Sequence, residues 1–110
     1  GFTDLGPDSV AVVTAAAGGI GTLLVQYAKN AGSTVIALAG GPAKVARAEA
    51  NGADLALDYT LPNWPDHARA FLDATGRWAT VVFDSVGGTT ARSTVGLLGE
   101  GGQHIVYGWS

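Results

Sequence analysis

The sequence predicts a doubly wound α/β domain, in which a parallel sheet of about five strands has helices on both faces. Five short apolar runs support this prediction, at residues 10–14, 35–39, 55–59, 81–84 and 105–107. Most of them do not alternate between apolar and polar residues, which is typical of strands covered on both faces, as in parallel sheets. The segments between the runs have helical spacing, so strand and helix alternate along the chain.

The first run leads into a glycine-rich turn, Thr-Ala-Ala-Ala-Gly-Gly-Ile-Gly at residues 14–21. Aligned with the dinucleotide fingerprint Gly-x-Gly-x-x-Gly, Ala16 stands at the first glycine, Gly18 at the second and Gly21 at the third. The second position lets a pyrophosphate approach the main chain, and the third lets the helix pack closely on its strand. Because a helix N-terminus also offers unpaired N–H groups, we interpret the turn as a phosphate site of the Rossmann type. A tight turn without a ligand is the alternative.

The helix after this turn is expected to be amphipathic. Its core-facing residues should be Ile20, Leu23, Leu24, Tyr27, Ala28 and Ala31, which recur at helical spacing. Thr22, Gln26, Lys29 and Asn30 fall on the opposite side. Gly32 is expected to end the helix, since glycine readily adopts the left-handed conformation after a last turn.

Proline, asparagine and glycine mark the ends of the next two helices. The second helix begins at residues 41–42, Gly-Pro, and ends at residues 51–52, Asn-Gly, because proline is tolerated in a first turn. The third helix has Asn63 as its expected N-cap, with Asp66 three residues later, and ends before Gly76. Its buried residues should be Trp64, Ala68, Phe71 and Leu72.

The fourth helix is expected to start near Thr89 and Thr90 and to end at Leu98 and Gly99, with the last strand at residues 103–107. With 110 residues and 47% hydrophobic content the chain can bury one core, so we expect a single domain over residues 1–110. It begins at Gly1 without methionine, which predicts a fragment, a processed chain or a trimmed one.

Composition excludes several classes of function. The net charge of −3 provides no basic field for nucleic acid or an anionic membrane surface. The absence of cysteine removes disulfides, thiol nucleophiles and thiolate metal sites. The apolar runs are too short to cross a bilayer and no signal peptide is evident, so a cytoplasmic location is expected. No carboxylate pair, metal cluster or Ser-His-Asp set emerges, and no catalytic residue is predicted.

The end of the second strand indicates which nicotinamide cofactor binds. An NAD site needs a carboxylate about 20 residues past the glycine turn, and Ala39 occupies that position. Gly40 and Gly41 follow, with Lys44 one turn into the next helix. A carboxylate would repel a 2′-phosphate, whereas small residues and an ammonium group would accept one, so the pattern favours NADP. The alternative for Lys44 is a solvated surface lysine.

Several motifs in order make the chain resemble a known family. They are Ala-Ala-Ala-Gly-Gly-Ile-Gly at residues 15–21, Val-Gln-Tyr-Ala-Lys at 25–29, Gly-Ala-Asp at 52–54, Tyr59, and Phe-Asp-Ser-Val-Gly-Gly at 83–88. From about residue 6 to the end, the chain resembles the cofactor domain of zinc-independent quinone oxidoreductases, in the medium-chain dehydrogenase/reductase superfamily. This resemblance implies a two-domain enzyme that passes a hydride from NADPH to a quinone or an α,β-unsaturated carbonyl compound.

The resemblance also assigns candidate cofactor-binding residues. The pyrophosphate would lie on the glycine turn, formed by Ala16, Ala17, Gly18, Gly19, Ile20 and Gly21. Gly40, Lys44 and Tyr59 would surround the 2′-phosphate, Ser85 and Val86 would lie against the ribose, and Tyr107 and Gly108 would lie near the nicotinamide. The family usually has serine or threonine where this chain has Gly-Gly-Pro at residues 40–42, so fewer hydroxyl donors are available to the phosphate.

The resemblance further implies elements that this chain lacks. A β-rich domain, which in the family precedes this one and carries most of the substrate pocket and any zinc ligands, is absent. A sixth strand, which commonly pairs two subunits, would follow residue 110, so the last strand would end as an unprotected sheet edge. This predicts either an unusual contact at that edge or a truncated chain. The parent protein is expected to be a homodimer, and this domain alone is expected to be inactive.

A short-chain dehydrogenase is excluded by its chemistry. It would share Thr14 and Gly-Ile-Gly at residues 19–21, but Ala15 replaces its glycine and no Tyr-x-x-x-Lys pair is present. Two other functions remain as alternatives. One is a non-catalytic module that binds or senses NADPH, and the other is an enoyl-reductase or zinc-dependent alcohol dehydrogenase cofactor domain.

Three polar residues have interpretations that need no catalysis. His67 is expected at the surface of the third helix. His104 should be packed or hydrogen-bonded locally, and Asp84 should cap the turn that follows the fourth strand.

Overall fold

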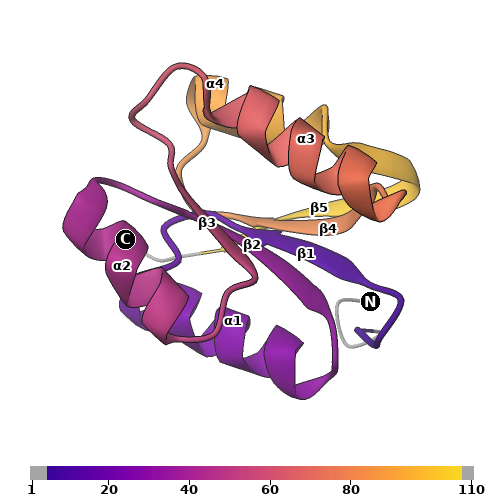
Figure 1. The fold of residues 1–110 in the computed structure, drawn as a ribbon, viewed down its shortest axis with the longest axis horizontal. Helices are drawn as coiled ribbons and strands as arrows, with labels where there is room; N and C mark the ends of the chain where they lie inside the picture. Colours follow the sequence, from indigo (N-terminus) through magenta and orange to yellow (C-terminus); the bar gives the residue numbers. More distant parts are fainter. Residues whose placement is uncertain (1–4, 108–110) are drawn as a thin grey trace.

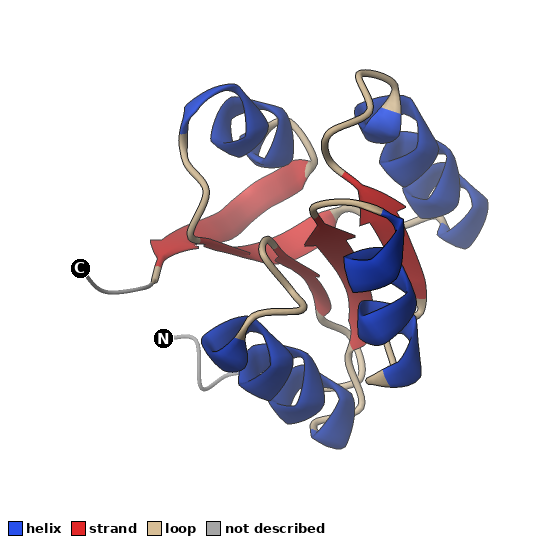
Figure 2. Cartoon of the chain, turned by 90° about the vertical axis from the view of Figure 1, so that its left-hand side faces the viewer, coloured by secondary structure: helices blue, strands red, loops and turns tan. Residues whose placement is uncertain are grey.

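The computed structural model describes residues 5–107 and confirms the doubly wound α/β fold (Figure 1). The elements are β1 (Val10–Val13), α1 (Gly19–Asn30), β2 (Thr34–Ala39), α2 (Pro42–Ala50), β3 (Leu55–Asp58), α3 (Trp64–Thr75), β4 (Ala79–Asp84), α4 (Gly88–Val95) and β5 (Leu98–Val106). All strand pairs are parallel, in the order β3-β2-β1-β4-β5. Helices α1 and α2 cover one face of the sheet, and α3 and α4 cover the other (Figures 1 and 2).

The chain reverses its direction across the sheet at β1. From β1 it proceeds outward to β2 and β3, and it then returns to the other side of β1 for β4 and β5. The carboxyl ends of β1 and β4 are thus adjacent, and their following loops diverge to opposite faces. Ligands in open parallel sheets bind at such a switch point.

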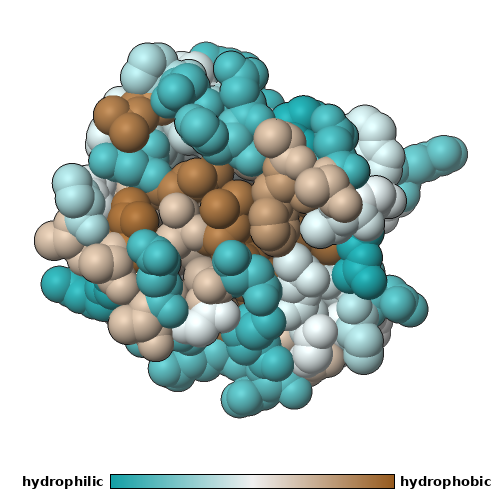
Figure 3. Space-filling model, viewed as in Figure 1, coloured by the Kyte–Doolittle hydropathy of each residue, from teal (hydrophilic) through white to brown (hydrophobic). Residues whose placement is uncertain are grey.

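Each face of the sheet has its own hydrophobic core. The core between the sheet and the helices α1 and α2 includes Ala11, Val13, Val25, Ala28, Val35, Ala37 and Phe83. The core on the other face of the sheet includes Val10, Val12, Ile36, Leu38, Ala68, Leu72 and Val82. The side chains of β1 are buried on both faces, as the unalternating run predicts. The edge strand β3 is only half-buried, and Figure 3 shows an apolar band across the middle of its side of the molecule.

The predicted buried face of α1 is correct in part. Ala28 is buried and Leu24 packs against the core, as predicted. Leu23 and Tyr27 are 65% and 41% exposed, and Gly21 and Val25, which were not predicted, are buried. A Cβ placed on Gly21 would lie only 2.2 Å from the carbonyl oxygen of Ala15. Because the helix begins this close to the turn, the face that carries Gly21, Val25 and Ala28 meets the sheet, and Leu23 and Tyr27 point away from it.

The ends of the first two helices agree with the sequence prediction, but the cap of α3 does not. Gly32 follows α1 with a φ of 85°, and α2 runs from Pro42 to Ala50. Asn63 stands at the N-cap position of α3, yet its side chain makes no capping hydrogen bond with the described residues. Its Nδ2 lies 3.3 Å from Nε2 of the exposed His67 instead.

The boundary between α4 and β5 also differs from the prediction. Helix α4 ends at Val95, and β5 begins at Leu98 rather than at residue 103. The register between β4 and β5 shifts within this glycine-rich stretch, where Ala79 pairs with Leu98 but Val81 pairs with Gln103. A Cβ on Gly99 would lie 2.7 Å from Cβ of Trp78, so glycine is needed for close approach and does not mark a loop here.

Strand β5 forms one edge of the sheet. No sixth strand is present within residues 5–107, as expected from the sequence. Val106, near the end of β5, is 74% exposed. Within residues 5–107, β5 is therefore an edge strand, and that this edge is unprotected stays a prediction.

A pair of glycine substitutions tests the packing of α1. We expect Gly21→Ala to lower the free energy of unfolding by roughly 3 kcal/mol, the upper end of the usual effect of overpacking, because its Cβ overlaps main-chain atoms. Gly19→Ala is the matched control, since a Cβ there meets nothing within 4 Å and alanine favours helix. Urea unfolding of both variants without cofactor measures the difference. Equal stability of the two would contradict the packing described here.

Candidate functional site

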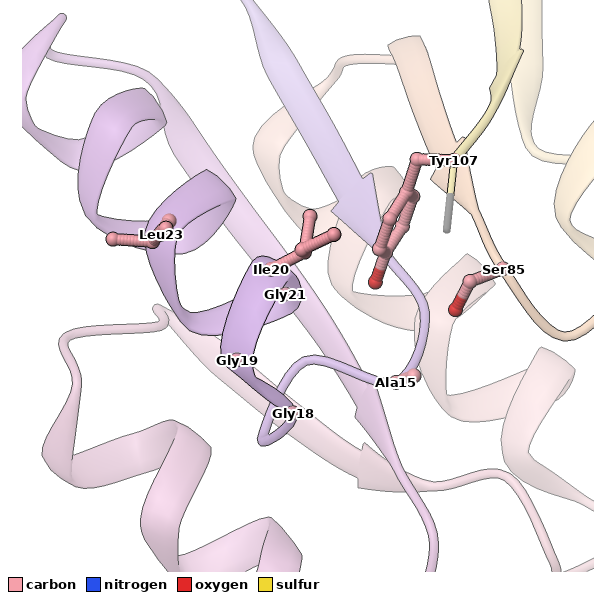
Figure 4. A pocket seen from close by; sticks show the side chains of 8 residues that line it. All are labelled: Ala15, Gly18, Gly19, Ile20, Gly21, Leu23, Ser85 and Tyr107. Carbon is pink, nitrogen blue, oxygen red and sulfur yellow. The ribbon is translucent and has the colours of Figure 1, made fainter. Parts of the chain in front are cut away.

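Two pockets lie at the carboxyl edge of the sheet, on either side of the glycine turn. The larger, of about 500 Å³, is lined by Ala15, Gly18, Gly19, Ile20, Gly21, Leu23, Ser85 and Tyr107 (Figure 4). The smaller, of about 210 Å³, is lined by Ala15, Ala17, Gly18, Ala39, Gly40, Lys44, Arg47 and Tyr59. Because both include Ala15 and Gly18, one elongated ligand could cross the turn and occupy both pockets.

The turn between the pockets exposes main chain. Ala15 has a φ of 50°, which is uncommon for a residue with a side chain, and its carbonyl accepts the N–H of Gly18 at 3.0 Å. Gly18 is the N-cap of α1, and no side chain of the described residues caps this end. The first turn of α1 contains no acidic residue. Its N–H groups, which have no acceptor within the helix, are therefore suited to an anion.

Two cations line the smaller pocket. Lys44 and Arg47 are three residues apart on α2, a spacing that places both on one face of the helix. Their neighbours in the pocket are small, and Gly40 has a specific reason to be so: a Cβ there would lie 3.2 Å from the hydroxyl of Tyr59. Sequence reasoning missed Arg47, although its spacing from Lys44 could have identified it. The pocket combines positive charge, a hydroxyl group and open space.

Asp58, at the end of β3, links the loop after that strand to the start of α2, beside this pocket. Its Oδ1 accepts the Thr60 hydroxyl at 2.6 Å, the Thr60 N–H at 3.0 Å and the Gly41 N–H at 3.1 Å. These bonds, that from the Thr60 hydroxyl foremost, hold the pKa of Asp58 below its usual value. The carboxylate thus fixes the start of α2, from which Lys44 and Arg47 project.

A buried carboxylate organises the end of β4. Asp84 is 2% exposed, and its Oδ1 accepts the Thr14 hydroxyl at 3.1 Å and the N–H groups of Val86 and Gly87 at 3.0 and 3.2 Å. Its Oδ2 lies 3.3 Å from Nε2 of His104. Burial alone would raise the pKa of Asp84, but these hydrogen bonds and the nearby His104 together lower it. Both Asp84 and His104 take the local roles that the sequence predicts.

Tyr107 forms part of the wall of the larger pocket. Its N–H donates to the carbonyl of Asp84 at 2.8 Å, and its hydroxyl donates to the carbonyl of Thr14. The pKa of Tyr107 lies above its usual value, chiefly because the phenol is buried. The negative charge of Asp84 also raises it, and a hydrogen bond with Ser85 lowers it in part. The phenol is therefore neutral at physiological pH. In Figure 4 the side chain of Ile20 points toward its ring, which gives the pocket an apolar wall.

Most of the residues predicted from the sequence line one of the two pockets. These are Ala17, Gly18, Gly19, Ile20, Gly21, Gly40, Lys44, Tyr59, Ser85 and Tyr107. Ala16 is fully buried in the core behind the turn, and its N–H donates to the carbonyl of Leu38. Val86 follows Ser85 and is 39% exposed, outside both linings. Gly108 lies outside the described residues. The cofactor contacts of all these residues remain predictions.

Known oxidoreductases are similar to this chain in sequence and in fold. A family model described as zinc-binding dehydrogenase matches residues 19–110. The 2-methylene-furan-3-one reductase of Solanum lycopersicum is 35% identical over 96 residues, which are 86% of this chain and 22% of that protein. The structure of an NAD-dependent alcohol dehydrogenase has a TM-score of 0.82 at 33% identity, over 93% of this chain and 29% of that one. The structure of Escherichia coli quinone oxidoreductase complexed with NADPH has a TM-score of 0.80 at 27% identity. The match covers 97% of this chain and 35% of that one.

These similarities cover about a third or less of each matched protein. Within residues 5–107, no three histidine, aspartate or glutamate side chains are grouped so that they could hold a metal ion. None of the helices in residues 5–107 is long and apolar enough to cross a membrane.

Asp84→Asn tests the network at the end of β4. We expect it to lower the free energy of unfolding by about 1.5–3 kcal/mol at neutral pH, because bonds to an ionised group are lost. The folded-state pKa lies below the ordinary 3.8, so the carboxylate stabilises the fold above that value and ceases to do so as the pH falls through the folded pKa. The difference between wild type and variant should shrink below about pH 4 in chemical unfolding followed against pH.

The control for this variant is Asp73→Asn, at an exposed position of α3. It should change the free energy of unfolding by less than about 0.5 kcal/mol at neutral pH. A difference for Asp84→Asn that persists at low pH would show that the carboxylate's charge is not what stabilises the turn.

Proposed function

The chain belongs to the zinc-binding dehydrogenase family, and on that premise we propose that it is the NADPH-binding domain of an oxidoreductase that reduces a quinone or an α,β-unsaturated carbonyl compound. Its resemblance to quinone oxidoreductases is confirmed by the similarity to the Escherichia coli enzyme. The observation that carries the proposal is the pair of pockets joined at the glycine turn, one of them lined by two cations.

The smaller pocket is the proposed site of the adenosine 2′-phosphate. Lys44 and Arg47 provide positive charge in a chain whose net charge is −3, and Ala39 leaves the end of β2 without the carboxylate that an NAD site needs. The similar structures include both an NAD-dependent enzyme and an NADPH complex, so similarity alone does not choose between the cofactors. The local charge favours NADPH because a phosphate dianion gains charge-assisted bonds there.

The larger pocket is the proposed site of the nicotinamide half. NADPH supplies the hydride when bound, and the protein's task is to bind and orient it. Ile20 and Leu23 provide an apolar wall, while Ser85 and the neutral Tyr107 provide polar groups on the opposite side. The N–H groups at the start of α1 lie between the two pockets and would face the pyrophosphate.

We assign the substrate pocket to sequence outside this chain. The chain spans 22% of the tomato reductase and 35% of the Escherichia coli quinone oxidoreductase, and its described residues offer no catalytic acid–base pair at the larger pocket. The family resemblance supports a β-rich substrate domain and a cytoplasmic homodimer for the parent protein. The open edge at β5 is available for pairing with a second subunit.

Calorimetric titration of the 110-residue chain with NADPH and NADH tests the proposed function. We expect NADPH to bind at least tenfold more tightly, as about 1.5–3 kcal/mol from a charge-assisted phosphate contact implies. Equal affinity for NADPH and NADH would show that the smaller pocket does not select the 2′-phosphate. If the chain bound neither cofactor, the proposed function would be wrong. Stopped-flow mixing with NADPH and a quinone should show no hydride transfer by this chain alone, because its acceptor site is incomplete.

Substitutions on α2 test which side chains hold the phosphate. Lys44→Ala and Arg47→Ala should each weaken NADPH binding by about 1.5–3 kcal/mol, on the order of tenfold to a hundredfold, and should leave NADH binding nearly unchanged. Arg92→Ala is the matched control, because Arg92 is an exposed arginine on α4 that contacts Thr89. A loss that is equal for NADPH and NADH would indicate that the lysine or arginine supports the fold and does not select the phosphate.

A further inference from the structure

His104 lies outside the two pockets but contacts the residue that shapes one of them. Its side chain is 28% exposed and comes from β5, whereas Asp84 comes from the end of β4. Among the described residues, His104 is the partner of Asp84 Oδ2, since the three other bonds of this carboxylate are to Oδ1. Histidine thus completes the hydrogen bonding of a carboxylate that is almost fully buried.

The chemistry of the pair assigns the proton. An ionised carboxylate only accepts hydrogen bonds, so Nε2 of His104 must carry a hydrogen and donate it to Oδ2. This holds for the neutral tautomer with hydrogen on Nε2 and for the imidazolium ion. In both forms His104 donates an N–H to Oδ2. A water molecule in its place would be a less fixed donor, and an apolar side chain would donate nothing.

Asp84 in turn holds the backbone beside the larger pocket. Its Oδ1 binds the N–H groups of Val86 and Gly87, and the hydroxyl of Thr14 links it to the N–H of Ser85 at 2.9 Å. Ser85 lines the larger pocket. The turn at residues 85–87 is therefore fixed by one carboxylate, and that carboxylate is fixed in part by His104.

We propose that His104 is a positioning residue for the nicotinamide half of the cofactor, which acts by holding the Asp84 carboxylate and, through it, the turn at residues 85–87. This inference rests on the proposed function of the larger pocket. Loss of the donor leaves a buried carboxylate oxygen without a partner, a state that proteins avoid. Asp84 then rotates toward solvent or takes up a proton, and its bonds to the turn weaken.

The effect should be confined to one end of the cofactor. The smaller pocket is built from the turn at residues 15–18, the end of β2, α2 and Tyr59, and none of these contacts Asp84 or His104 through the bonds described above. A ligand that occupies only the smaller pocket should therefore bind independently of His104. Adenosine 2′,5′-bisphosphate is such a ligand, since it has the 2′-phosphate and adenosine but lacks nicotinamide.

Two variants of the 110-residue chain separate hydrogen bonding from packing. His104→Leu keeps an apolar volume without a donor, and His104→Gln keeps an N–H donor at a similar reach. Calorimetry should show NADPH binding about tenfold or more weaker in His104→Leu and within about threefold of wild type in His104→Gln, as a bond to a charged group implies. Adenosine 2′,5′-bisphosphate should bind all three proteins within about twofold of one another.

Each other result overturns the inference. Unchanged NADPH affinity in His104→Leu would mean that the turn does not depend on His104. Equal weakening of NADPH and the bisphosphate would mean that His104 supports the whole fold, and equal weakening of NADPH in both variants would exclude the donor role. If the wild-type chain binds both the bisphosphate and NADPH, the proposed function stands, and a contrary result in the variants refutes only the role of His104. If the wild-type chain binds neither ligand, the proposed function fails, and the inference fails with it.

Discussion

The contact between Gly21 and the carbonyl of Ala15 is the constraint on which the arrangement of the site depends. Because Gly21 lacks a side chain, α1 begins directly against the turn that leaves β1. The N-terminus of the helix is thereby held beside Gly18, which both pockets share. A helix held farther from the turn would separate the two pockets from its N–H groups. The same close packing rotates α1, so that Val25 meets the sheet and Leu23 is left on the wall of the larger pocket.

The two pockets use charge in opposite ways. The smaller presents cations on an exposed helix face, where Lys44 and Arg47 could neutralise an incoming dianion. The larger has no charged residue in its lining. The carboxylate of Asp84, which holds the neighbouring turn, is buried and has four hydrogen-bond partners. A buried ion with satisfied bonds contributes rigidity and little field at the pocket. One end of the site is therefore suited to attract a ligand and the other to hold it in a fixed orientation.

Local features explain which parts of the molecule were predictable from the sequence. The strands, the glycine turn and the ends of α2 follow from apolar runs, glycine and proline, and each of these acts over a few residues. Leu23 and Tyr27 were wrongly expected on the buried face of α1 because hydrophobicity ranks them above Gly21, whereas the distance between helix and turn decides the orientation. Arg47 was within reach of the sequence through its spacing from Lys44. The contact of Asp84 with His104 was not, since only the pairing of β4 with β5 brings residues 20 apart together.

The two pockets also differ in whether nearby residues or strand pairing form them. Apart from the shared turn, the smaller pocket comes from residues 39–59, a single continuous stretch around α2. Substitutions there can therefore change the charge and size of this pocket without disturbing the rest of the sheet. The larger pocket relies on the ends of β1, β4 and β5, which provide Thr14, Asp84 and Tyr107. Strand β5 is also one of the two edge strands of the sheet that the described residues form, the other being β3. A strand paired with this edge would contact β5, which carries His104 and leads into Tyr107. Under the proposed function, such pairing would bear on the nicotinamide end of the site, whereas the smaller pocket draws no residue from β5.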